Sequence, residues 1–399
     1  MLKLGFRYKQ FHPFMLFTFD FLRKCLEILF NIHPYKDCIG FIIMFLFFFS
    51  QSLIGLIIYF YYSKKRTKIK KPIGTMQLIN KFYKKKDSKL KKFFLIIFAS
   101  FFSFVGNTIP SNDVIKFGKK EETNSQLEVR VRSIQIIISS LACYYTIKIR
   151  FYKHQKFSMV FIVVFLIFIL IMELIIAPII YIKIISLLIC TVSCACRAFM
   201  DITEKYLFEY NYVNILIMLV HEGNIGTILY FIFFLFNKTY QNQAKNLLKN
   251  LIDVPEYDWT FISLIIFIFF YIIIIGLRNA YRVTTNKYYS PMSRTLIESS
   301  LDPFIFLYNF LSSNNERNLE FWSYFGFIIF CLTVIAFFSL VYNDFIVLYC
   351  CGLERNTYSE ITRRLYLDTI HVIKEFKDEE ESQLIIDENG EVYSEGTYV

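Results

Sequence analysis

The chain alternates between long apolar runs and shorter polar segments. Most of the runs hold about 20 residues, which is the length of a helix that crosses roughly 30 Å of hydrocarbon. Such runs predict membrane-spanning helices rather than the core of a soluble protein. The pattern predicts nine spans, at residues 38–62, 93–110, 133–150, 157–177, 179–198, 212–236, 259–277, 293–311 and 321–342.

A tenth, weaker candidate is the segment 12–31, "HPFMLFTFDFLRKCLEILFN". Asp20, Arg23, Lys24 and Glu27 interrupt it, but they stand three and four residues apart and can form ion pairs along one helix face. Charge inside a span is costly, so this helix either faces the interior of a bundle or lies at the membrane surface. We favour a span. The expected fold is all-α, a polytopic membrane bundle of nine to ten transmembrane helices.

Composition and charge narrow the class of protein further. Hydrophobic residues make up 55% of the 399 residues, and the net charge of +11 lies mostly between the apolar runs. This distribution is typical of a membrane protein with basic cytoplasmic loops and does not favour a nucleic-acid partner. The sequence contains no CxxC, HExxH, P-loop or GxSxG motif and no Cys/His ligand spacing. We therefore expect no catalytic site, no bound metal and no cofactor.

The loops predict the orientation. The densely basic loop 63–92 should be cytoplasmic, and alternation of the spans places the basic segments 148–156 and 278–287 on the same side. Ten spans with both termini in the cytoplasm satisfy every loop. The tail 346–399 is acidic and is expected to be disordered. Its segment "EEESQLII" has dileucine-sorting spacing at Leu384 and Ile385, which favours an endomembrane or lysosomal membrane, although such short motifs often arise by chance.

Two segments of the chain are similar to each other. "RSIQIIISSLACYYTIKIRFYKHQKFSMVFIVVFLIFIL" starts at Arg132 and "RTLIESSLDPFIFLYNFLSSNNERNLEFWSYFGFIIFCL" starts at Arg294. In each, an arginine opens a span, Ser-Ser-Leu follows, and an aromatic-Ser pair precedes the next apolar run. The repeat predicts halves at 1–177 and 178–345 with five helices each. An odd number of helices inverts the second half relative to the first, as in many secondary transporters.

Several motifs occur in an order that resembles a known family. They are His33-Pro34 before a span, "GNT" at Gly106, "FYKHQKFS", "TEKYLFEYNYVNILIMLVHEGNIG", "SRTLIESSL" after Asn279, Lys287 and Ser290, and "VYND". Over about residues 31–344 the chain resembles the drug/metabolite transporter superfamily, specifically the nucleotide-sugar-transporter-like solute carrier family 35, F subgroup. The resemblance implies a transporter fold but not a substrate. The subgroup's first helix is poorly matched by residues 1–30, and the tail is longer than usual.

A short charged band, "MDITEKYLFEYNYVNILIMLVHEGNIG", lies between two apolar stretches. Glu204 and Lys205 belong to the family-like signature, and we interpret them, with Asp201, mainly as a solvated connection between helices. Glu222 stands about two turns inside a span, where an ionised carboxylate is costly unless paired. It is either a buried structural or coupling carboxylate or an interfacial one. Gly223 and Gly226 would let neighbouring helices approach closely.

A second set of candidates is basic. Arg294 and Glu298 stand four residues apart and can pair, and the repeat places Arg132 opposite them. With Asn279 and Glu222, these residues are candidates for a cavity that holds an anion such as a phosphate. The alternative is that the arginines only snorkel to the membrane surface.

These observations lead to a hypothesis of function. We expect a secondary-active transporter of a small polar or anionic metabolite that works by alternating access. Its partners would be the lipid bilayer and a small-molecule substrate, with a homodimer left open. The alternative is a transport-inactive scaffold that retains the fold. An open polar cavity reached by Arg132, Asn279 and Arg294 would favour transport, whereas a cavity plugged by Phe and Tyr would favour a scaffold.

Overall fold

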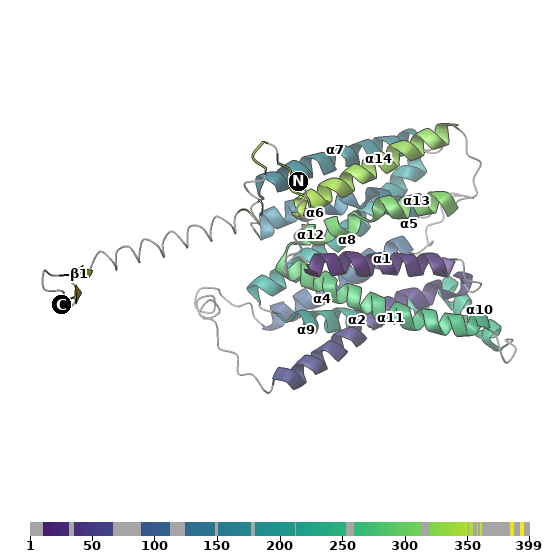
Figure 1. The fold of residues 1–399 in the computed structure, drawn as a ribbon. Helices are drawn as coiled ribbons and strands as arrows, with labels where there is room; N and C mark the ends of the chain where they lie inside the picture. The colour runs from purple at the N-terminus through teal and green to yellow at the C-terminus, as the bar shows by residue number, and fades with distance from the viewer. Residues whose placement is uncertain are drawn as a thin grey trace.

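The chain folds into a bundle of roughly parallel helices (Figure 1). The computed structural model describes residues 11–31, 36–66, 89–111, 124–147, 151–176, 180–211, 213–252, 259–312 and 319–349, together with a few positions of the tail. The helices are α1 (Phe11–Asn31), α2 (Lys36–Arg66), α4 (Lys89–Ser111), α5 (Asn124–Val131), α6 (Ser133–Thr146), α7 (Lys153–Ile175), α8 (Ile180–Tyr210), α9 (Ile215–Phe236), α10 (Lys238–Ile252), α11 (Trp259–Tyr288), α12 (Pro291–Ser299), α13 (Asp302–Ser312) and α14 (Leu319–Tyr342).

Seven of the described helices are long and apolar enough to cross a membrane, namely α2, α4, α7, α8, α9, α11 and α14. Their outward faces carry large apolar side chains such as Phe231, Phe269 and Phe330, each more than half exposed, as lipid contact requires. The chain is therefore an integral multi-pass membrane protein. The predicted count of nine to ten spans is not confirmed.

Two of the predicted spans are not single long helices. The predicted span 133–150 is the 14-residue α6, which begins at Ser133 and ends at Thr146, and Arg132 separates it from the preceding α5. In place of 293–311, α12 and α13 are separated by Ser300 and Leu301. Pro303 explains the second interruption, because proline fits only the first turn of a helix and its ring clashes with a carbonyl one turn earlier. Arg132 keeps helical dihedral angles (φ −53°, ψ −30°), and no glycine or proline accounts for the first interruption.

The weak candidate span 12–31 forms α1, which packs along α11. Its Asp20 is only 1% exposed, so the charged face of α1 points into the bundle. This placement agrees with a bundle-facing helix rather than one lying on the membrane surface. The charges that weaken its apolar pattern are thus part of the interior.

The apolar core has two main parts. One lies among α6, α7, α12 and α14, around Ile136, Ile162, Leu296 and Ile328. The other lies among α2, α9 and α11 and is largely aromatic, with Phe48, Tyr230 and Tyr271. These two parts flank the elements that carry most of the buried charge, α8, α11 and α12.

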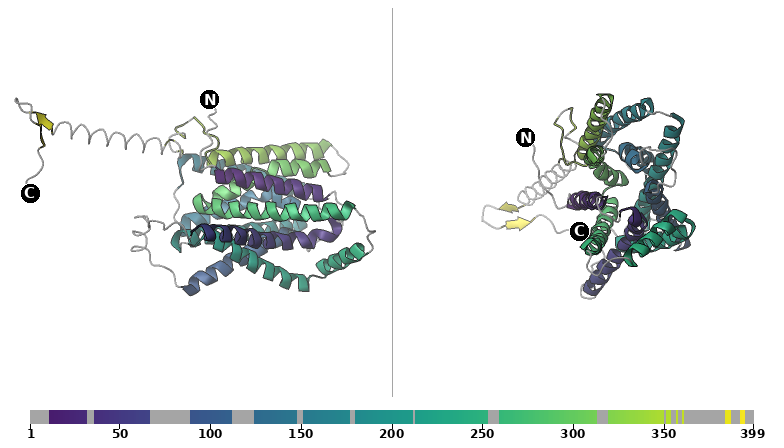
Figure 2. Two further views of the ribbon diagram at one scale, coloured as in Figure 1. Left: turned by 60° about the horizontal axis from the view of Figure 1, so that its bottom comes forward. Right: turned by 90° about the vertical axis from the view of Figure 1, so that its right-hand side faces the viewer.

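One further helix adds Tyr240 to the second part of this core, and one further segment lies outside it. Helix α10 directly follows Asn237 and packs against α2 and α9. In the tail that we expected to be disordered, β1 (Leu384–Ile386) pairs antiparallel with β2 (Val392–Ser394), away from the bundle (Figure 2). Residues 67–88 of the basic loop and most of the tail are outside the described residues.

Candidate functional site

Arg282 of α11 holds together three carboxylates from two other helices. Its Nη1 lies 2.7 Å from Glu204 Oε1 and 3.7 Å from Asp201 Oδ1, both on α8. Its Nη2 pairs with Glu222 Oε2 on α9. One turn further along α11, Asn286 Nδ2 donates to Glu204 Oε2 at 2.8 Å. All of these side chains are buried, so the ion pairs join α8, α9 and α11 inside the bundle.

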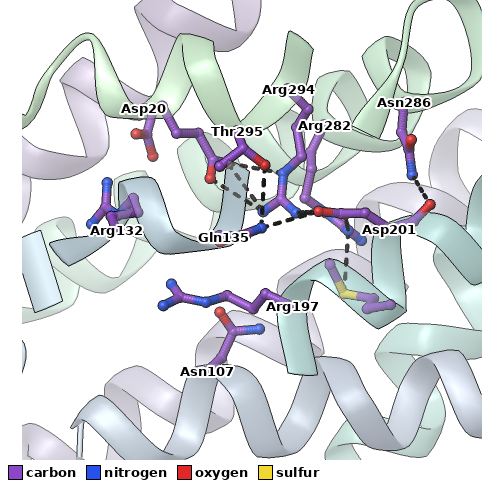
Figure 3. Close-up of polar contacts among 12 residues, drawn as sticks. Asp20, Asn107, Arg132, Gln135, Arg197, Asp201, Arg282, Asn286, Arg294 and Thr295 are labelled. Carbon is purple, nitrogen blue, oxygen red and sulfur yellow. Dashed lines mark hydrogen bonds and ion pairs between the residues drawn. The ribbon is translucent and has the colours of Figure 1, made fainter. Parts of the chain in front are cut away.

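Arg294 extends this arrangement to α12. Its Nη1 contacts both carboxylate oxygens of Asp201, with Oδ1 at 2.5 Å, and its Nη2 lies 3.2 Å from Glu298 Oε2. Gln135 of α6 donates to Asp201 Oδ2 at 3.2 Å, so the carboxylate is held from two sides (Figure 3). The pairing of Arg294 with Glu298 that the sequence predicts is therefore present, and Asp201 is a second partner that it did not predict.

Arg278 links the same group of charges to α1. Its Nη2 lies 2.5 Å from Glu298 Oε1, and its Nε lies 3.2 Å from Asp20 Oδ1. Asp20 also pairs with Arg23 at 3.0 Å. We call this set the charge network, leaving aside the Lys24–Glu27 pair that adjoins Arg23 and adds one charge of each sign. Its members are Asp20, Arg23, Asp201, Glu204, Glu222, Arg278, Arg282, Arg294 and Glu298.

The interpretation of Asp201, Glu204 and Lys205 as a solvated connection is wrong. The two acids are fully buried, and Lys205 is 4% exposed. Lys205 Nζ donates to the backbone carbonyls of Lys287 at 2.8 Å and Tyr289 at 2.9 Å. It thereby satisfies carbonyl groups at the C-terminal end of α11 that have no partner within the helix.

Glu222 is buried rather than interfacial, and the two glycines beside it explain how its helix reaches α2. Gln51 of α2 donates to Glu222 Oε2 at 2.6 Å. A Cβ atom added to Gly223 would collide with the backbone of Ser52, and one added to Gly226 would collide with Phe48. The two positions therefore allow α9 to contact α2 closely, which brings Glu222 to Gln51 and Arg282.

A cavity of about 310 Å³ adjoins the charge network. Six cationic and three acidic side chains line it, and the aromatic groups beside them include Phe47 and Tyr271. The charged residues are Arg23, Lys24, Arg132, Arg197, Arg278, Arg294, Glu27, Glu128 and Glu298. The excess of cations makes the cavity suitable for an anion rather than a cation or an apolar molecule.

The cavity includes some of the predicted candidates and not others. Arg132, Arg294 and Glu298 line it, whereas Asn279 and Glu222 do not. Asn279 is fully buried; its Oδ1 accepts from Arg278 at 3.0 Å, and its Nδ2 donates toward Gln51 at 3.4 Å. The assignment of Asn279 and Glu222 to the cavity is thus corrected, since both lie within the surrounding polar contacts.

Two of the lining arginines, Arg132 and Arg197, have hydrogen-bond donors that no group in the described part of the chain accepts. Arg132 Nη1 lies 2.9 Å from Asp302 Oδ1, and Arg197 Nη2 pairs with Glu128 Oε1. The Nε atoms of both arginines are buried and have no hydrogen-bond partner among the described residues. In Figure 3, Arg132 lies on the side of Gln135 opposite Asn286, and the side chain of Arg197 runs below Gln135. Since Arg132 stands at the α5–α6 interruption and Asp302 begins α13, this ion pair joins the two interrupted helices.

Exposure shows where the cavity meets solvent. Along α1 the exposed fraction of the side chain rises from 1% at Asp20 through 20% at Lys24 to 28% at Glu27. At the other end of the cavity, Arg294 and Glu298 are at most 6% exposed. The cavity therefore opens toward the C-terminal end of α1 and is closed where it meets the charge network.

Several important residues were not among the sequence-based candidates. Arg197, Glu128 and Asp302 were not singled out, and Arg278 and Arg282 were assigned only to a basic cytoplasmic segment. The sequence does contain an indication that Arg278 and Arg282 belong to a polar helix face. Arg278, Arg282 and Asn286 stand four residues apart and share one face directly after an apolar run. Within the described residues, no group of three or more His, Cys, Asp or Glu side chains could hold a metal ion.

Comparison with known proteins adds no assignment. No protein-family model matches the chain, and no curated protein matches it significantly. The resemblance to the drug/metabolite transporter superfamily therefore stays a prediction. The cavity and the residues around it are the features of the molecule that bear on its function.

Proposed function

We propose that the protein is a secondary transporter that moves a small anionic metabolite across its membrane. The observation that carries the proposal is the buried, cation-rich cavity of about 310 Å³ with unfilled guanidinium donors. Burying arginine is costly unless an anion accompanies it, so spare donors at Arg132 and Arg197 favour a ligand with negative charge. A transport site of this kind lies inside the bundle and is reached from one side at a time.

The packing of the helices supports a build from two inverted halves, 1–177 and 178–345. In this pairing α1 corresponds to α8, α2 to α9, α4 to α11, α6 to α12 and α7 to α14. The contact of α1 with α11 then corresponds to that of α8 with α4, and the contact of α2 with α11 to that of α9 with α4. The pairs α2–α9, α6–α12 and α7–α14 each map onto themselves. Such an exchange pattern is what a two-fold axis between the halves would produce.

The interrupted helices support the same proposal. We infer that α5–α6 and α12–α13 each act as one crossing, which gives ten crossings together with α1 and the seven long helices. Discontinuous helices at corresponding positions of two halves are typical of transporter binding sites near the middle of the membrane. This arrangement is also the fold that the resemblance to the drug/metabolite transporter superfamily implies.

A transport-inactive scaffold is the second candidate. It is favoured by the acidic partners of the lining arginines, since Arg278 and Arg294 both pair with Glu298 and Arg197 pairs with Glu128. Phe47 and Tyr271 also occupy part of the lining. In a scaffold these charges would only hold the helices together, and no ligand would be needed.

Uptake into vesicles separates the two candidates. The purified chain would be reconstituted and offered nucleotides, nucleotide sugars, sugar phosphates and dicarboxylates, with organic amines as the cationic comparison. Transport of an anion that is lost in Arg197→Gln and kept in Lys156→Gln, an exposed lysine on α7, would support the proposal. Folded protein in the vesicles that moves no anion, or that moves amines instead, would contradict it.

A further inference from the structure

The charge network contains more acids than bases. Five carboxylates face four guanidinium groups in it. The nearby Lys205 does not make up the difference, because it is directed to two backbone carbonyls and to Glu209. An unpaired ionised carboxylate inside a membrane protein costs several kcal/mol, so the surplus charge needs a counterpart.

The surplus is concentrated at Glu204 and Glu222, which share the single guanidinium group of Arg282. Glu204 contacts Nη1 and Glu222 contacts Nη2 of this group, so the two carboxyl groups lie next to each other. Glu222 Oε1 is buried and has no donor among the described residues, while its Oε2 already accepts from Arg282 and Gln51. Two carboxylates in such contact repel each other unless a proton lies between them.

We propose that Glu204 and Glu222 together bind one proton, and that this proton is the coupling ion of the transporter. This inference rests on the proposed function. Binding adds one proton to the pair and leaves one negative charge, which Arg282 balances. Release of the proton leaves two negative charges at one guanidinium group, and repulsion from Glu204, which Arg282 holds to α11, pushes Glu222 and α9 away from α8 and α11. Proton release would thus be linked to opening of the closed end of the cavity, and proton binding to its closure.

The groups facing the pair are consistent with a proton rather than a metal ion. Arg282 on α11, Arg294 on α12 and Asp201 on α8 are the charged neighbours, and Gln51 supplies the polar contact from α2. Of the remaining ionisable groups nearby, His221 of α9 is exposed, and Lys91 of α4 lies over the ring of Tyr206. Arg282, which contacts both carboxyl groups, and Arg294, which lies beyond Asp201, would repel a metal cation.

The proton can be observed directly in the full chain in lipid nanodiscs. Infrared difference spectra between acidic and basic pH should show the carbonyl band of a protonated carboxylic acid that disappears as the pH rises. The band should be absent in both Glu204→Gln and Glu222→Gln, because the remaining acid is then ionised and paired with Arg282. Glu209→Gln, a partly exposed acid on the same helix as Glu204, is the matched control and should keep the band.

Coupling is tested with spin labels at Ile217 of α9 and Tyr288 of α11, both exposed and at the ends of helices that pack together. The distance between the labels should be longer at basic than at acidic pH in the unaltered protein and in Glu209→Gln. In Glu222→Gln it should stay at the short value, since glutamine mimics the protonated acid.

Each result decides a separate point. The absence of a titrating carboxyl band, or a band that survives in both variants, would overturn the proton site. A band that titrates while the distance stays constant would show a structural proton and overturn the coupling. Neither result depends on anion uptake. Failure of the transport proposal in the vesicle assay can therefore be told apart from failure of the proton site.

Discussion

Two sets of buried arginines in this protein have opposite surroundings. Arg282 and Arg294 each contact carboxylates from more than one position, and their acids belong to α8, α9 and α12. Arg132 and Arg197 each have one carboxylate partner and a buried Nε without an acceptor. The first set is saturated and joins helices, whereas the second set borders the cavity with hydrogen-bonding capacity left over.

The difference shows why burial alone does not identify a binding residue. All four arginines are at most 10% exposed in their side chains. What separates them is how many of their donors the protein itself satisfies. A saturated arginine stabilises the fold, and an unsaturated one at a cavity can bind a ligand without losing an internal contact.

The largest effect is expected for Arg282→Gln. The change leaves Glu204 and Glu222 without a counter-charge in the interior, which should lower the free energy of unfolding by roughly 3–5 kcal/mol. Thermal unfolding in detergent, followed by circular dichroism, measures the loss. The control Lys156→Gln removes a charge from an exposed position and should leave the midpoint unchanged. A midpoint equal to that of the unaltered protein would show that Arg282 is not a structural centre.

Much of the fold could be predicted from the sequence, because apolar length and loop charge report directly on membrane crossing. The seven long helices lie within or around predicted spans, and the charges of α1 were correctly seen as able to pair on one face. The interruption at Pro303 was missed although "DP" stands inside the span 293–311. The interruption at Arg132 has no comparable signal in the residues.

The site was harder to predict, because the partner of a buried charge is usually distant in the sequence. Arg294 and Glu298 were predicted from spacing along one helix, whereas Asp201 stands 93 residues from Arg294 and Glu222 stands 60 residues from Arg282. Basic residues after an apolar run fit a cytoplasmic loop as well as a buried face. Positive-inside reasoning therefore assigned Arg278 and Arg282 to the wrong environment, and only the three-dimensional packing distinguishes the two.

A paired replacement should separate ligand binding from stability in the second set. Arg132→Gln with Asp302→Asn removes both charges of one ion pair together and leaves no buried charge unpaired, so stability should change by less than about 1.5 kcal/mol. Binding of the transported anion should nevertheless weaken by roughly 1.5–3 kcal/mol, because a charged donor is lost. Isothermal titration with the anion found in the uptake panel measures this. Unchanged affinity would place Arg132 with the structural arginines.

The close contact of α9 with α2 should affect only the first set of arginines, Arg282 and Arg294, because it positions Glu222. Gly223→Ala forces a Cβ into the backbone of Ser52 and should cost about 1–3 kcal/mol of stability, because the contact is overpacked. Gly326→Ala in α14 is the matched control, since a Cβ there meets nothing within 4 Å. The measurement is the unfolding midpoint of each variant beside the unaltered protein. Equal midpoints for the two variants would mean that α9 does not need this approach to present Glu222 to Arg282.

The smallest effect is expected at the open end of the cavity, where the charges are partly hydrated. Lys24 and Glu27 form an ion pair at 2.9 Å with side chains 20% and 28% exposed. Exposed and partly exposed pairs contribute at most about 1 kcal/mol, so Lys24→Gln should shift the unfolding midpoint very little. It should instead slow anion uptake at low ionic strength, and added salt should reduce the difference because it screens this charge. Uptake rates measured across a salt series provide the test. A salt-independent loss of rate in Lys24→Gln would mean that Lys24 binds the anion directly, as Arg132 and Arg197 are proposed to do. The anion-binding site would then extend along α1 to Lys24.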